Sequence, residues 1–159
     1  MKKIVLVAIC AMFAMASKAQ STTDELKYLQ DVIGMKKQQY VEQHMYLSAA
    51  DAPKFWAIYD DYDLYRSEIG ERRLANINEY VNNYGKLSNE KADQLMKTSF
   101  AITDDLDKLL QKTYARMAKD ISPVVGVQFV QIELYIEAMV RKALTEQVPG
   151  MYESEQKKK

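Results

Sequence analysis

The chain of 159 residues is poor in the residues that several common kinds of protein require. It has one Cys, one His, 5 Gly and 3 Pro. A single Cys excludes a disulfide framework and a zinc finger, and a single His argues against most catalytic triads. Few Gly and Pro argue against a loop-rich β sandwich and against a disordered Pro/Gly-rich chain. The formal net charge of zero gives no reason to expect a nucleic-acid partner.

What is present begins with a secretory signal. Two lysines precede the apolar run 4–16, which is too short to cross a bilayer as a helix. Ser17 and Ala19 are the small residues of a cleavage site before residue 20. We therefore predict a signal peptide over residues 1–19 and a soluble periplasmic protein.

Cleavage at this site changes the composition of the chain. The mature protein, residues 20–159, has 19 basic and 22 acidic residues, a net charge of −3, and no Cys. A lipoprotein would instead be anchored through Cys10, but Ile9 stands where a small residue is expected. The most apolar later stretch, 124–143, contains acidic and basic residues, so we do not expect the mature chain to be embedded in a membrane.

Hydrophobic periodicity predicts an all-α fold, and no segment shows the alternation of a strand. Capping serines and a helix-ending Gly85 set most of the expected boundaries. The four expected helices are 24–46, 49–83, 89–120 and 123–148. We expect them to form elongated antiparallel helical hairpins in one domain, 20–148, followed by a polar tail, 149–159. The last helix is apolar on two sides, which is typical of a central position in a bundle.

Two similar turns precede the second and third expected helices. They are Leu47-Ser48-Ala49-Ala50-Asp51 and Leu87-Ser88-Asn89-Glu90-Lys91. In each, Leu can pack against the new helix while Ser caps it. Together with Phe55-Trp56, Tyr59-Asp60-Asp61-Tyr62 and the stretch 128–133, these turns resemble the Spy/CpxP family, whose signature is two Leu-Thr-x-x-Gln motifs. Ser48 and Ser88 keep the capping hydroxyl of Thr, whereas Asp51 and Lys91 replace the Gln.

The resemblance implies a periplasmic stress protein. Spy is a chaperone that works without ATP as a cradle-like homodimer, CpxP dampens a membrane-bound sensor kinase, and other relatives bind zinc, nickel or cobalt. Our leading expectation is a chaperone-like protein that binds unfolded clients. The alternative is a regulatory partner of a membrane-bound envelope-stress sensor or anti-sigma factor. A metal-responsive protein is third, and an enzyme is the least favoured.

Aromatic residues give a candidate client surface. Trp56, Tyr59, Tyr62 and Tyr65 share about three turns of the second expected helix. Tyrosine suits such a surface because it offers contact area at little entropic cost and tolerates water. We expect Tyr59 and Tyr62 to face outward as client contacts, with Arg72 and Arg73 as charges at the rim. The alternative is that these tyrosines pack in the core.

No residues stand out for catalysis or for binding a cofactor. The acidic clusters 60–63 and 104–107 have no nucleophile, glycine-rich loop or cofactor motif beside them, and are most simply solvated helix faces. His44 is one imidazole on a helix, which is too few ligands for tight binding of zinc or nickel. We therefore expect no catalytic residues, no metal site and no cofactor.

Overall fold

The computed structural model describes residues 27, 30–32 and 34–148, and this part of the chain is helical without strands, which confirms the expected all-α class. Its helices are α2 (Lys37–His44), α3 (Ala52–Asn83), α4 (Asn89–Asp120) and α5 (Pro123–Gln147). The expected signal peptide, 1–19, and the expected tail, 149–159, lie outside the described residues.

The start of α4 confirms the predicted cap, and α5 begins with a cap of the same kind. The Ser88 hydroxyl oxygen accepts a hydrogen bond of 3.2 Å from the backbone N–H of Lys91. In the same way, Ser122 accepts a bond of 3.2 Å from Val125, directly before Pro123. Each cap satisfies an N–H group that has no partner within its helix, which typically contributes about 1 kcal/mol.

Ser48 makes the expected hydrogen bond, but the helix that follows it begins later than expected. Helix α3 begins at Ala52, not Ala49, and its N-cap residue is Asp51, whose side chain makes no capping bond. The Ser48 hydroxyl oxygen accepts a hydrogen bond of 3.2 Å from the Asp51 N–H, and the Ser48 carbonyl accepts one of 3.0 Å from Ala52. Ser48 therefore makes the predicted bond to the N–H three residues on, as Ser88 does, although the first residue of α3 is Ala52.

The expected continuous helix over 24–46 is also wrong. Residues 30–32 are helical, but Gly34 has a φ of +76° and its N–H donates to the Gln30 carbonyl at 2.9 Å. A positive φ is accessible to glycine and ends a helix. The chain then turns, and α2 forms a separate helix from Lys37.

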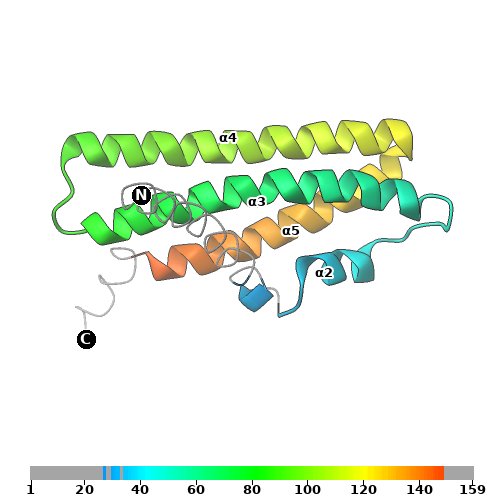
Figure 1. Cartoon of the computed structure of the whole chain (residues 1–159), viewed down its shortest axis with the longest axis horizontal. Coiled ribbons are helices and arrows are strands. Elements are labelled where there is room, and N and C mark those ends of the chain that lie inside the picture. The colour runs from blue at the N-terminus through cyan, green and yellow to red at the C-terminus, as the bar shows by residue number, and fades with distance from the viewer. Residues whose placement is uncertain (1–26, 28–29, 33, 149–159) are drawn as a thin grey trace, which may run out of the picture.

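Figure 1 shows α3 and α4 side by side and running in opposite directions, with α5 crossing beside them and α2 next to α5. Helix α4 packs against both α3 and α5, and α2 packs against α5. Three ion pairs join the facing edges of α3 and α4 along their length: Asp61 with Arg116, Arg72 with Asp105, and Glu79 with Lys91. The side chains of these pairs are partly exposed, so each pair contributes at most about 1 kcal/mol.

Helix α5 is long and apolar enough to cross a membrane by length and composition, over Pro123–Glu146. A core helix of a soluble protein passes the same test. In this fold the two acidic side chains in the middle of α5 are directed at partners: Glu133 pairs with Lys37 and Glu137 with Arg73. The apolar residues Phe129, Ile136 and Val140 are buried, whereas Val124, Val127, Leu134 and Tyr135 are 47–68 % exposed. Helix α5 therefore buries one of its two apolar sides, and the expected central position was wrong.

Candidate functional site

The two tyrosines expected on the surface are buried. Tyr59 is 1 % exposed and Tyr62 is 5 % exposed. Their rings lie 6.4 and 5.0 Å from the ring of Phe129 on α5, in edge-on contact. The expectation that Tyr59 and Tyr62 face outward was wrong, because α3 has neighbours on more than one side and α5 covers this face.

Arg72 and Arg73 are engaged in ion pairs. Arg72 is half-exposed and its guanidinium lies 2.7 Å from Asp105 of α4. Arg73 is more buried and binds both carboxylate oxygens of Glu137 on α5, at 2.7 and 3.1 Å. A bidentate pair of this kind holds two helices in a defined orientation. The two arginines therefore tie α3 to both of its long neighbours.

A cluster of buried charges lies where α2, α3 and α5 meet. The Lys37 ammonium is 2.9 Å from Asp63 and 3.0 Å from Glu133, and both Lys37 and Glu133 are buried. The Tyr62 hydroxyl donates to the other Glu133 oxygen at 2.8 Å. The same ammonium lies over the rings of Tyr59 and Tyr62, 5.3 and 4.8 Å from their centres. This cluster joins α2 to the rest of the fold.

The two tyrosine hydroxyls of this region have different surroundings. Burial, followed by the nearby carboxylates, raises the pKa of both phenols well above the usual value of 10. Tyr62 donates to Glu133, but no described residue forms a hydrogen bond with the Tyr59 hydroxyl. A buried hydroxyl without a partner is unfavourable by about 1–3 kcal/mol.

This difference predicts opposite effects of the same substitution. Tyr59→Phe removes an unpaired hydroxyl and should raise the free energy of unfolding by about 1 kcal/mol, whereas Tyr62→Phe removes the bond to Glu133 and should lower it by about 2 kcal/mol. Urea unfolding of the mature protein, followed by circular dichroism, measures both values. Equal effects in the two variants would contradict the assigned hydrogen bonding.

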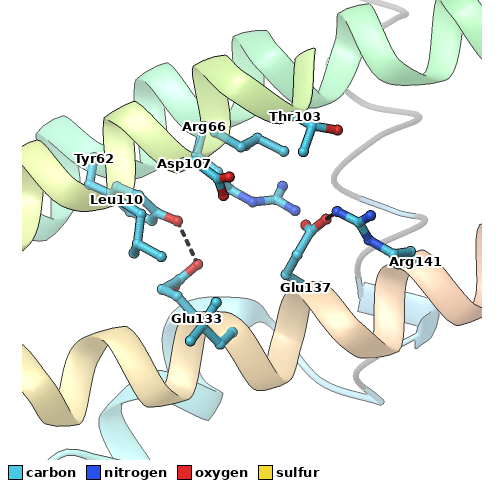
Figure 2. Close-up of a pocket in the computed structure, with 10 residues that line it drawn as sticks. Tyr62, Arg66, Thr103, Asp107, Leu110, Glu133, Glu137 and Arg141 are labelled. Carbon is cyan, nitrogen blue, oxygen red and sulfur yellow. Dashed lines mark hydrogen bonds and ion pairs between the residues drawn. The ribbon is translucent and has the colours of Figure 1, made fainter. Parts of the chain in front are cut away.

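Figure 2 shows a small cavity between α3, α4 and α5, with Tyr62 bonded to Glu133 on one side and Glu137 close to Arg141 on the other. Its volume is only about 40 Å³. That space suffices for one or two water molecules and not for an organic ligand. This cavity is therefore too small to be a ligand site. A larger space of about 330 Å³ lies beside Lys37 and Asp63 of the charge cluster and is lined by polar and charged side chains.

His44 is exposed at the end of α2. Its Nδ1 is 2.7 Å from the Tyr40 carbonyl oxygen and its ring stacks on that of Tyr40, at 4.1 Å between centres. Within the described ranges, no group of three or more His, Cys, Asp and Glu side chains is placed to hold a metal ion. The expectation that His44 binds no metal stays a prediction.

Acidic residues of both expected clusters face basic partners. Asp61 and Asp63 pair with Arg116 and Lys37, and Asp104 and Asp105 pair with Lys108 and Arg72. The pairing of Asp104 with Lys108 raises the pKa of that lysine. These contacts connect helices or turns of one helix, and they give the clusters a structural role.

An apolar groove lies at the end of the molecule where α3 turns into α4. It has a volume of about 540 Å³, within the range of ligand pockets. Its walls come from one face of α3, one face of α4 and the end of α5. The lining residues are Asn76, Ile77, Tyr80, Tyr84, Leu87, Ala92, Leu95, Met96, Ser99 and Val148. None of these is charged, which sets the groove apart from the polar cavity of Figure 2.

The groove exists because the three long helices differ in length. Helices α3 and α4 have 32 residues each, and α5 has 25. At about 1.5 Å per residue, the α3–α4 pair is roughly 10 Å longer than α5. In Figure 1, α5 ends before the left-hand end of the pair. Tyr84 and Met96 consequently remain 41 % and 54 % exposed.

Ile77, Tyr80 and Tyr84 have the three- and four-residue spacing of an apolar helix face in the second expected helix, but this spacing alone does not identify them as a site. The available signal was that the expected helix 49–83 is longer than the expected helix 123–148. The apolar face of the longer helix must be exposed where it extends beyond the helix that covers it. Leu87, from the second family-like motif, also lines the groove. The first motif residue, Leu47, is partly buried against the core.

Comparison of the chain with protein-family models, with curated proteins and with solved structures found no match.

Proposed function

We propose that the mature protein is a periplasmic, Spy/CpxP-like chaperone that binds unfolded client proteins in the apolar groove without ATP. The observation that carries this proposal is the uncharged groove of about 540 Å³ at the end of the α3–α4 pair. The exposed side chains of Tyr84 and Met96 form two walls of the groove, and they favour contact with apolar side chains of a client. With no charged group in the lining, the groove does not require a particular client sequence.

Binding in such a groove should be weak and reversible. Full burial of one large apolar side chain contributes about 1.5–3 kcal/mol, and ordering a flexible client opposes it. A groove that takes two or three side chains therefore releases its client without an energy source. The cradle-like homodimer that the resemblance implies is part of the proposal, since it would place two grooves in one particle. Its mass in solution can be measured by light scattering.

The test is suppression of aggregation by the purified mature protein. The probe is reduced α-lactalbumin, with aggregation followed by light scattering. The variant Tyr84→Ser/Met96→Ser removes two exposed groove walls and should reduce suppression several-fold. The matched control, Leu64→Ser/Tyr65→Ser, removes two side chains of α3 that are 62 % and 53 % exposed outside the groove. It should leave suppression unchanged.

Helical content by circular dichroism must be the same in both variants. If the control variant loses as much activity as the groove variant, clients bind exposed apolar surface in general and the groove is not the site. If the unmodified protein suppresses no aggregation, the chaperone proposal fails. The leading proposal is then a regulatory partner of a membrane-bound sensor or anti-sigma factor, which would supply an amphipathic helix for the same groove.

A further inference from the structure

The groove adjoins the point where the described chain ends. Val148, the C-cap residue of α5, lines the apolar groove and also the neighbouring cavity of about 270 Å³. That cavity shares Asn76, Ile77 and Ser99 with the groove. The eleven residues 149–159 therefore follow a residue that lies at the edge of the groove.

The composition of this segment matches the groove over a short stretch. Pro149 and Gly150 cannot continue α5 favourably, and Met151-Tyr152 follows directly. The remaining residues, Glu153 to Lys159, are polar or charged. Met151 and Tyr152 are thus the large apolar side chains of the segment, and they are of the same two types as the exposed groove walls.

The distance is also suitable. Tyr152 is four positions after Val148, and an extended chain over four positions reaches at most about 13 Å. Along α3, Ile77 to Tyr84 covers seven residues, or about 10 Å. Met151 and Tyr152 can therefore reach most of the groove without any change in α5.

We propose that Met151 and Tyr152 bind the apolar groove of their own chain and that clients must displace them. A ligand held on so short a connection has an effective concentration of about the millimolar range. Even a weak contact then keeps the groove occupied and hidden from water until a client with more apolar contacts competes. This regulatory role rests on the proposed client function, whereas the docking itself does not.

The docking is tested without a client. The mature chain, residues 20–159, contains no Cys, so Ser154→Cys provides a unique site for a nitroxide spin label. Paramagnetic broadening in NMR spectra should be strong at Tyr80, Leu95 and Met96 of the groove and weak at Val41 and Met45 of the opposite end. Adding Met151→Ser/Tyr152→Ser to the labelled chain should weaken the broadening at the groove, where the undocked label is held near Val148 only by its connection to α5. Equal broadening in both chains, or none at the groove, overturns the docking.

The regulatory role is tested by aggregation suppression with the unlabelled Met151→Ser/Tyr152→Ser chain. We expect suppression to increase several-fold at limiting protein concentration, because the competing segment no longer fills the groove. Unchanged or reduced suppression overturns the role of the segment as a competitor. If no version of the protein suppresses aggregation, the client function fails while the spin-label result still decides the docking.

Discussion

Phe129→Ala should lower the free energy of unfolding by about 3–5 kcal/mol, the usual cost of removing a large buried aromatic side chain. Phe129 is fully buried on α5. Its ring lies 6.2 Å from Phe55, and it also contacts the rings of Tyr59 and Tyr62. The substitution therefore leaves a cavity between α3 and α5 that three large rings surround and cannot fill.

Urea unfolding of the mature protein measures this effect. The control is Phe100→Ala, since Phe100 on α4 is 67 % exposed and its loss should change stability by no more than about 0.5 kcal/mol. A loss below 1 kcal/mol for Phe129→Ala would show that this ring does not occupy the centre of the core.

Lys37→Met should be the next most damaging change, with a loss of about 3 kcal/mol. The ammonium is the partner of Glu133, which is only 4 % exposed. Without Lys37 the carboxylate keeps the Tyr62 hydroxyl but loses its close positive charge. A buried charge that loses its partner is costly, whereas removal of both charges often is not.

The double variant Lys37→Met/Glu133→Gln supplies the control. The Gln side chain still offers an oxygen to Tyr62, and neither charge remains in the core. We expect the double variant to be more stable than Lys37→Met by 1 kcal/mol or more, on the order of the coupling measured between contacting residues. If the loss of stability in the double variant equals the sum of the losses in Lys37→Met and in Glu133→Gln alone, Lys37 and Glu133 do not act as a pair.

Much of the helical part of this fold could be predicted from local sequence. The limits of α4 and the start of α5 follow from Ser88, Ser122 and Pro123, because capping and the proline ring act on neighbouring residues. The end of α3 follows from Gly85, which has a φ of +81°. Gly34 is likewise a local signal for the end of a helix. The predicted helix over 24–46 was wrong because it continued through this glycine.

The site was harder to predict because it depends on contacts between distant segments. Lys37 and Glu133 are 96 positions apart, and neither belongs to a motif. The burial of Tyr59 depends on α5 crossing α3, which the periodicity of α3 cannot show. Likewise, Tyr80 and Tyr84 have the same three- and four-residue helical spacing from their apolar neighbours as the buried Tyr62. Only the position at which α5 ends determines that they line a groove.

The number of neighbours that α3 has decreases along its length. Near its start, Phe55 and Tyr59 pack against α5 and lie in one core with Val41 of α2. Beyond Ile77, the neighbour of α3 within the described chain is α4, and the helix leads into the turn at Gly85. Local opening requires least free energy where few apolar contacts must be broken. The groove end can therefore loosen while the aromatic end stays folded, and a binding site whose walls can separate in this way can adjust its width to side chains of different sizes.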